Sequence, residues 1–333
     1  MNVTSPTTSP PPRALRERAV TWLRLFRPHH APLTLTAGIA GMTVAPDNPT
    51  TASLVVGALI CFGGYPMGQV FNDYADREAD AINAPHRPFV TGEINPIVAL
   101  SVVAAITVTA LVAAAIVAPG VLVWTAVAIV GNATYSLVKG LPMVGNVANG
   151  IDLAFFVLIG AAAAAPERSP FDVPSEVVVC AVLVAVMLSA FCLLSYFKDI
   201  TGDRAAGYRT LPVVLDGRGA RFWTIPIPLA GFAAAAAIAV ADPSILGADG
   251  SNVAFWALLV LAAGAFAMSI AQVFTPDPEA KGKEALVWSV RGAVLYALAL
   301  AALPEPELIL ALTIPIVAFM EIAYFDTRHE RQA

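Results

Sequence analysis

Two short acidic segments of the chain carry residue types that can bind phosphate through a metal ion. In the first, Asp73, Asp76 and Asp80 follow directly after a long apolar stretch. Each residue of a helix advances by about 100°, so these three carboxylates fall within a wedge of roughly 60°. Carboxylates on one stripe repel one another unless a cation neutralises them. Hard oxygen ligands at a site open to phosphates favour Mg²⁺.

The second acidic segment also ends an apolar stretch. Asp199 and Asp203 form an i, i+4 pair, and the basic residues Lys198 and Arg209 flank them. One such cluster alone indicates a solvated helix end. Two facing clusters with basic side chains indicate a clamp for a diphosphate, in which metal ions bridge acid to phosphate and Lys or Arg neutralises the remaining charge.

The elements that must position both segments are membrane helices. Charged residues make up 13% of the 333 residues, hydrophobic residues 58%, and the mean hydropathy is +0.73; a soluble protein carries about a quarter charged residues. A spanning helix needs about 20 mostly apolar residues. Ten stretches qualify: 31–46, 51–72, 96–117, 119–138, 147–165, 176–198, 221–241, 252–273, 285–303 and 307–325. Because the first is short and the last two are joined tightly at Pro304, we expect nine or ten spans.

The basic residues orient these spans, because Lys and Arg accumulate in cytoplasmic loops. With ten spans and the N-terminus inside, Arg168 is the one residue of the 19 Lys and Arg that falls outside. We therefore expect both termini and both acidic segments on the cytoplasmic side. Transporters place ionisable groups near the bilayer midplane. Here nearly all charges lie at span ends, with Asp152 and Glu321 as partial exceptions. Asp152 either lines a polar cavity or snorkels to the interface.

Two regions are expected along the chain, an N-terminal segment of residues 1–27 and a membrane domain of residues 28–333. Met1–Pro12 is rich in Ser, Thr and Pro and is predicted to be disordered. Arg13–Arg27 is basic and partly amphipathic, which favours a segment that lies on the membrane surface.

Other site classes receive little support from the sequence. The net charge of −5 and the absence of a basic run argue against nucleic-acid binding. Cys61, Cys180 and Cys192 lie in apolar stretches without metal-binding spacing, so we expect small buried apolar residues there.

The two acidic segments resemble the signatures of a known family. Asn72-Asp73-x-x-Asp76-x-x-x-Asp80 with Asn83-x-Pro85-x-Arg87-Pro88 resembles the first signature of the UbiA superfamily of intramembrane prenyltransferases. Lys198-Asp199-x-x-x-Asp203 with Gly207 and Arg209-Thr210-Leu211-Pro212 resembles the second. Both motifs occur in the family's order, and the resemblance extends from Arg27 to the end of the chain.

The resemblance implies an all-helical ring of about nine membrane helices around a central cavity, where Mg²⁺ grips a prenyl diphosphate and an acceptor captures the carbocation. Motif matching implies these metal ligands: Asn72, Asp73, Asp76, Asp80, Asp199 and Asp203. The implied catalytic residues among them are Asp73, Asp76, Asp199 and Asp203. It implies these contacts to the diphosphate: Arg27, Asn83, Arg87, Tyr135, Lys139, Lys198 and Arg209.

The expected reaction is Mg²⁺-dependent prenyl transfer to a lipophilic acceptor of aromatic, quinone or lipid type. A membrane terpene cyclase with the same motifs and no acceptor is the alternative, and a non-catalytic lipid-binding or transport protein is a third possibility. Polar residues that could orient an acceptor are Gln69, Asn132, Asn146, Asn149 and Asp152. Aromatic residues that could shield a carbocation are Phe62, Tyr65, Phe71, Phe155, Phe156, Phe191, Tyr196 and Phe197.

Overall fold

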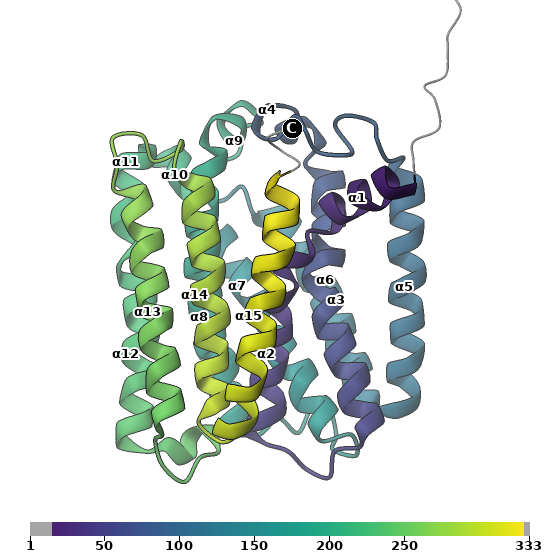
Figure 1. The fold of residues 1–333 in the computed structure, drawn as a ribbon, viewed down its shortest axis with the longest axis vertical. Coiled ribbons are helices and arrows are strands. Elements are labelled where there is room, and N and C mark those ends of the chain that lie inside the picture. Colours follow the sequence, from purple (N-terminus) through teal and green to yellow (C-terminus); the bar gives the residue numbers. More distant parts are fainter. Residues whose placement is uncertain (1–14, 330–333) are drawn as a thin grey trace, which may run out of the picture.

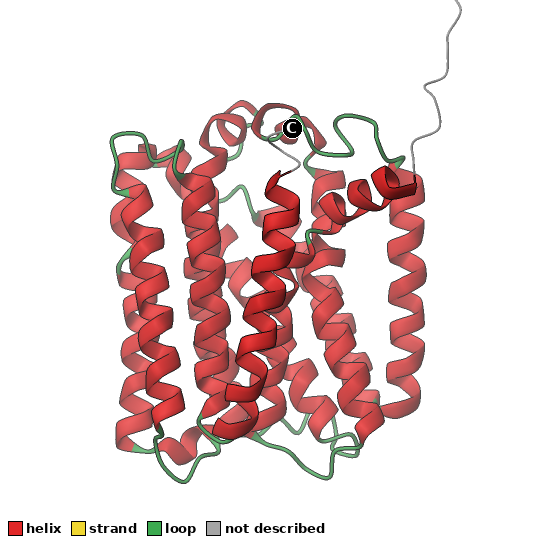
Figure 2. Cartoon of the chain, viewed as in Figure 1, coloured by secondary structure: helices red, strands yellow, loops and turns green. Residues whose placement is uncertain are grey.

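A computed structural model describes residues 15–329 of the chain. Its described part contains helices and loops and no strand (Figure 2). The segment predicted to be disordered, together with Arg13 and Arg331, lies outside the described residues. The basic segment that follows forms helix α1, which lies across one end of the bundle (Figure 1).

The helices follow one another along the chain in a fixed order. They are α1 Leu15–Phe26, η1 Pro28–His30, α2 Ala31–Val44, α3 Thr51–Ala75, α4 Arg77–Asn83, α5 Pro96–Val117, α6 Pro119–Val138, α7 Val144–Ala164, α8 Ser175–Ser195, η2 Tyr196–Asp199, α9 Ile200–Ala205, α10 Leu211–Val214, α11 Asp216–Ala220, η3 Arg221–Thr224, α12 Pro226–Ala241, η4 Pro243–Leu246, α13 Val253–Val273, α14 Gly282–Ala302 and α15 Pro306–His329. The long helices run side by side, and the short ones lie at the two ends (Figure 1).

Nine helical stretches of the described chain are long and apolar enough to cross a membrane, so the prediction of nine or ten spans is confirmed. The tenth candidate is α2, whose 14 residues extend over about 21 Å. Separate helices α14 and α15 show that the predicted division at Pro304 is right. The chain is an integral membrane protein with multiple spans.

Local sequence signals explain where several of these helices begin. Pro96, Pro119 and Pro306 occupy first helical positions, where the missing N–H has no partner to lose. Thr50 caps α3 by accepting a hydrogen bond from the backbone of Ser53, and the Ser53 side chain accepts one from the backbone of Thr50. Thr50, Pro119 and Pro306 lie at the end of the bundle opposite the acidic segments, whereas Pro96 begins α5 at the same end as those segments (Figure 1).

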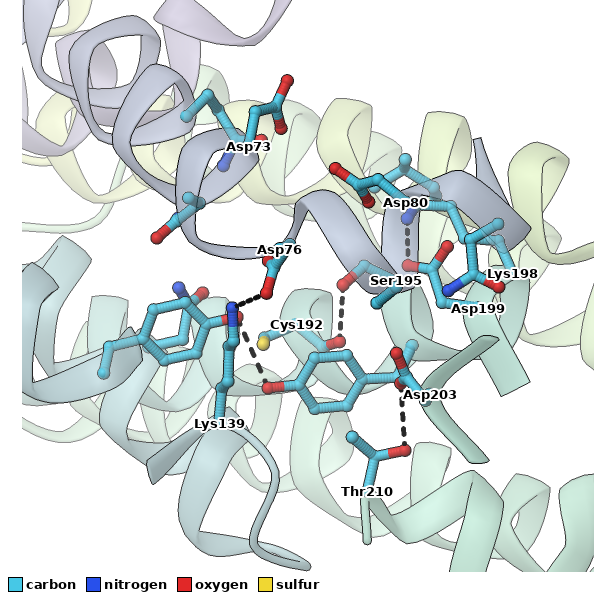
Figure 3. Close-up of a pocket in the computed structure, with 18 of the residues that line it drawn as sticks. Asp73, Asp76, Asp80, Lys139, Cys192, Ser195, Lys198, Asp199, Asp203 and Thr210 are labelled. Atoms are coloured by element: carbon cyan, nitrogen blue, oxygen red, sulfur yellow. Dashed lines mark hydrogen bonds and ion pairs between the residues drawn. The ribbon is translucent and has the colours of Figure 1, made fainter. Parts of the chain in front are cut away.

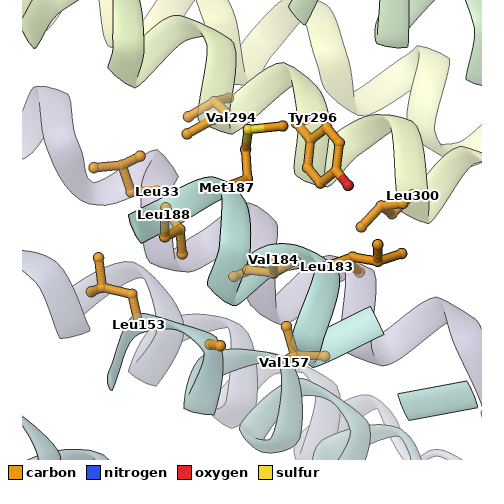
Figure 4. Packing of buried hydrophobic residues seen from close by; sticks show 14 of the residues in the cluster. Leu33, Leu153, Val157, Leu183, Val184, Met187, Leu188, Val294, Tyr296 and Leu300 are labelled. Carbon is orange, nitrogen blue, oxygen red and sulfur yellow. The ribbon is translucent and has the colours of Figure 1, made fainter. Parts of the chain in front are cut away.

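The bundle is built around α2, α7, α8 and α14, whereas α5 and α15 are mostly exposed on its outside. Leu33, Val157, Met187 and Val294 come from the four central helices and meet in one core (Figure 4). Small residues allow close approach of backbones in lipid, where packing drives association. At the α2–α7 crossing a Cβ built on Gly160 would overlap the carbonyl of Gly38.

The close α2–α7 crossing predicts that Gly160→Ala lowers stability. The added methyl group must separate the two helices, and overpacking of this kind costs about 1–3 kcal/mol. The matched control is Gly264→Ala in α13, because a Cβ on Gly264 meets no atom within 4 Å. We expect a lower thermal unfolding midpoint in detergent for the first variant and not for the second. Equal midpoints would contradict the close crossing.

Candidate active site

The first acidic segment begins at the end of α3 and continues in α4. The predicted single helix is interrupted at Asp76, yet the hydrogen bonds continue across the break. The Asp76 amide donates to the Asn72 carbonyl at 2.8 Å, and the Asp80 amide donates to the Asp76 carbonyl at 2.8 Å. The carboxylates therefore remain close together, although they point to different partners (Figure 3).

Two arginines neutralise the buried carboxylates of this segment. Asp73 is 3% exposed and accepts hydrogen bonds from Arg27 Nη2 at 2.7 and 2.5 Å. Arg87 Nη1 lies 3.2 Å from Asp73 and also pairs with Asp80. Burial raises the pKa of the Asp80 carboxyl, and the charge of Arg87 opposes that shift. Arg87 thus links two carboxylates that are two helical turns apart.

Asp76 faces a different set of partners. It pairs with Lys139, which caps the C-terminal end of α6, and accepts a hydrogen bond from the Tyr208 hydroxyl at 3.1 Å. Burial and the neighbouring charge of Asp76 raise the pKa of Tyr208, so this hydroxyl is a donor at neutral pH. Tyr135, one turn before Lys139, has its hydroxyl 3.5 Å from that of Tyr196.

The second acidic segment lies in η2 and α9 at the end of α8. Asp199 pairs with Lys198, and Asp203 accepts a hydrogen bond from the Thr210 hydroxyl at 3.3 Å. Glu279 caps α9 by accepting from the Thr201 amide at 2.7 Å and its hydroxyl at 2.8 Å. The loop before α14 therefore holds the second acidic segment in position.

Two hydrogen bonds join the segments to each other. The Gly202 amide donates to Asn83 Oδ1 at 2.8 Å, which connects α9 to α4. Tyr208 connects the loop after α9 to Asp76. A Cβ on Gly202 would overlap the Asn83 side chain, so glycine permits this close approach. Both segments lie at the same end of the bundle, near both ends of the described chain (Figure 1).

The joined segments surround one cavity of about 890 Å³, counting its open mouth. Twelve of the thirteen predicted site residues line it: Arg27, Asn72, Asp73, Asp76, Asp80, Asn83, Arg87, Tyr135, Lys139, Lys198, Asp199 and Asp203. Arg209 does not, and its side chain is exposed. Gly207 has a φ of 79°, and the turn at this residue brings Tyr208 into the cavity lining and leaves Arg209 outside.

Tyr208 and His30 are among the lining residues that the sequence did not indicate. Tyr208 follows Gly207 of the second motif, and that glycine was the one available signal for it. His30 comes from the short η1 helix, and its ring lies 5.3 Å from that of Tyr65. His30 belongs to no motif, so only the packing of η1 against α3 reveals it. Thr210 was part of the second motif, but its hydrogen bond to Asp203 was not expected.

An apolar groove adjoins this cavity and shares Tyr65, Gln69, Asn72 and Asn149 with it. Phe71 and Phe156 are among the predicted aromatic residues that line the groove. Phe62 lines a further apolar hollow, Phe155 stacks against Trp124, and Phe197 is fully buried in the core. The three cysteines are all buried, as predicted, and Cys192 lines the polar cavity.

Asp152 lies in the wall of the apolar groove. Its side chain is 3% exposed, and Asn132 Nδ2 lies 3.5 Å from Asp152 Oδ2. A residue this deeply buried does not snorkel to the interface, and the groove that it lines is mostly apolar.

Comparison with known proteins agrees with this geometry. Residues 33–291 match the model of the UbiA prenyltransferase family. A digeranylgeranylglyceryl phosphate synthase of Natronomonas pharaonis is 33% identical over 256 residues, which cover 74% of this chain and 83% of that protein.

Solved structures share the fold. A UbiA homolog from Aeropyrum pernix K1 superimposes with a TM-score of 0.66 at 22% identity, over 81% of this chain and 96% of that chain. A UbiA homolog from Archaeoglobus fulgidus bound to DMAPP and Mg²⁺ gives 0.59 at 17% identity, over 83% and 99%. This chain therefore belongs to the UbiA prenyltransferase family and is a prenyltransferase.

Proposed function

We propose that this enzyme binds a geranylgeranyl diphosphate with Mg²⁺ in the cavity between α4 and α9 and transfers the prenyl group to a glyceryl phosphate lipid. The observation that carries the proposal is the meeting of two carboxylate segments from distant helices, with four basic side chains among them. Such a site suits a ligand with several negative charges and a metal counter-ion.

The donor set fits Mg²⁺ shared with a phosphate ligand. Among residues 15–329 no group of three or more His, Cys, Asp or Glu side chains is close enough to form a resident metal cage. Mg²⁺ does not require one, because it binds through one or two carboxylates plus phosphate oxygens and water. In our proposal Asn72, Asp73 and Asp76 would hold one metal site, with Asp80 near it, and Asp199 and Asp203 would hold the other. The bound ions neutralise the diphosphate and make it a better leaving group.

The basic residues complete the proposed diphosphate site. Arg27, Arg87, Lys139 and Lys198 each pair with a carboxylate of the cavity. Their donors can turn to diphosphate oxygens when the ligand enters. Asn83 keeps the two segments at a fixed separation, and Tyr135 lines the same wall. Because Arg209 is exposed outside the cavity, we leave it out of the proposed site.

The proposed reaction breaks the allylic C–O bond, and the diphosphate leaves with the bonding electron pair. An acceptor oxygen forms a new bond to the prenyl carbon and loses its proton. The carbocation must be kept from water, since hydrolysis otherwise competes. The adjoining apolar groove offers a dry place for the prenyl chain, with Tyr65, Phe71 and Phe156 in its wall.

The identity of the acceptor is inferred from the relatives. The Natronomonas pharaonis relative and one from Halobacterium salinarum at 31% identity over 264 residues are both named digeranylgeranylglyceryl phosphate synthases. That product arises when a geranylgeranyl group joins a glyceryl phosphate that already carries one. We therefore prefer prenyl transfer to cyclisation as the proposed reaction, and a lipid to an aromatic or quinone compound as the proposed acceptor.

We propose that the cavity opens on the cytoplasmic side. Arg168 lies in the loop between α7 and α8, at the end of the bundle away from α4 and α9. The excess of Lys and Arg at the α4–α9 end then follows the positive-inside rule.

The metal site predicts that Asp76→Asn and Asp199→Asn each lower Mg²⁺-dependent diphosphate release at least about 100-fold, as expected when a charge stabiliser of the transition state is lost. Asn is preferred to Ala because it preserves the volume beside Lys139 and Lys198. The control is Asp172→Asn, an exposed carboxylate between α7 and α8. Wild-type release in both active-site variants would sink the site assignment.

The junction of the two segments predicts a defect for Gly202→Ala. Its methyl group would push α9 away from Asn83. We therefore expect the affinity for prenyl diphosphate to fall about tenfold, which corresponds to a loss of about 1.4 kcal/mol of binding free energy. Gly250→Ala serves as control, because a Cβ there meets no atom within 4 Å. Titration calorimetry in the presence of Mg²⁺ measures the prenyl diphosphate affinity of both variants. Unchanged affinity in Gly202→Ala would show that the spacing of the segments does not matter.

A further inference from the structure

A second chamber opens beside the diphosphate cavity. It lies between α1, the first turns of α14 and the C-terminal part of α15. We call it the basic vestibule. Its lining shares Arg27, Arg87 and Lys198 with the cavity. Three further basic residues, Arg24, Lys283 and Arg291, line the vestibule but not the cavity.

Basic side chains outnumber acidic ones in the lining of the vestibule. Six Arg and Lys side chains line it, against two carboxylates, Asp199 and Glu284. Lys283 is exposed and forms no ion pair with any residue between 15 and 329. Arg24 donates to Glu93 at 3.2 Å and to the His86 carbonyl at 2.5 Å. The vestibule therefore has capacity for an anion beyond its internal pairs.

One face of α14 forms a wall of this chamber. Lys283, Val287 and Arg291 are spaced by four residues and lie along one stripe of the helix. Arg291 forms a two-point pair with Glu321 of α15 at 2.6 Å and lies 4.6 Å from the centre of the Trp288 ring. Ionisable residues inside membrane helices are energetically costly, and they often mark functional sites.

The composition of the wall suits a lipid headgroup. Trp and Tyr side chains favour the boundary between membrane and water, and Trp288 and Tyr324 both line the vestibule. Leu286 and Val287 add apolar surface beside the basic rim. A molecule with one charged phosphate and an attached hydrocarbon chain matches both parts.

We propose that the basic vestibule binds the phosphate group of the lipid acceptor, with Lys283 and Arg24 as its own anion-binding residues. This inference rests on the proposed function. In a glyceryl phosphate the phosphate is only a few bonds from the glycerol oxygens, so it must bind next to the reacting carbon. The apolar groove on the other side cannot take it, because a charge in an apolar environment is costly. The vestibule adjoins the cavity and carries the needed charge.

Binding of matched probes tests this assignment in a phosphate-free detergent. The probes are geranylgeranylglyceryl phosphate and geranylgeranylglycerol, which differ by the phosphate. We expect Lys283→Glu to weaken binding of the phosphate probe about tenfold and to leave binding of the alcohol unchanged. Arg218→Glu is the control, since it makes the same charge change at an exposed residue of α11 outside the lining of both the vestibule and the cavity. Prenyl diphosphate affinity, unchanged in both variants, reports correct folding.

Three results would overturn the assignment. The first is an equal loss of affinity for both probes in Lys283→Glu, and the second is an equal loss for the phosphate probe in Arg218→Glu. The third is competition by an ordinary phospholipid as strong as that of the phosphate probe, which would make the vestibule a general site for membrane headgroups. A transfer assay on the same samples tests the proposed function separately. If wild-type enzyme binds the phosphate probe through Lys283 but does not prenylate it, the proposed function fails and the vestibule assignment stands.

Discussion

Five carboxylates from two distant parts of the chain are gathered at one end of an apolar bundle, and each lies beside a cation or hydroxyl donor. Burying a charge without a partner is expensive, and removing one member of a buried pair is strongly destabilising. The pairing of acid with base is therefore the constraint that the surrounding structure has to satisfy. It explains why η1, the end of α6 and the loop after α4 all converge on the ends of α3 and α8. Arg87 illustrates the constraint best, because a single guanidinium serves both Asp73 and Asp80.

The same pairing gives the site a way to accept its ligand. In the proposed complex, each lysine or arginine that now neutralises a carboxylate would turn toward the diphosphate, and that carboxylate would bind Mg²⁺ instead. The exchange preserves local neutrality, so the ligand does not need to find a preformed cage of acids. Among the described residues no such cage exists. The proposed acceptor site follows the same principle, because the basic vestibule shares Arg27, Arg87 and Lys198 with the cavity and would hold a second anion next to the first.

Much of this arrangement was predictable from the sequence, because both motifs have strong local signals. The aspartate spacings and the ends of apolar stretches indicated that the two acidic segments would meet, and the family resemblance implied the other site residues; twelve of the thirteen predicted residues line the cavity. Arg209, which was expected to contact the diphosphate, lies outside the lining, because residue spacing does not reveal the direction of a turn, which here depends on the positive φ of Gly207. His30 was missed because its place depends on the packing of a three-residue helix. The span count was left open at two places. Separate helices resolve the division at Pro304, and the first candidate is α2, which is short as the sequence indicated.

The most direct test of the central claim is a double-mutant cycle across the two acidic segments, read out by Mg²⁺-dependent binding of a non-reactive thio analogue of the prenyl diphosphate. Residues that grip one ligand together are energetically coupled, whereas independent sites add within about 0.3–0.5 kcal/mol. We expect Asp76→Asn combined with Asp199→Asn to bind the analogue hardly more weakly than the weaker single variant. Strictly additive losses would contradict the claim, since they would mean that the two segments do not share one diphosphate.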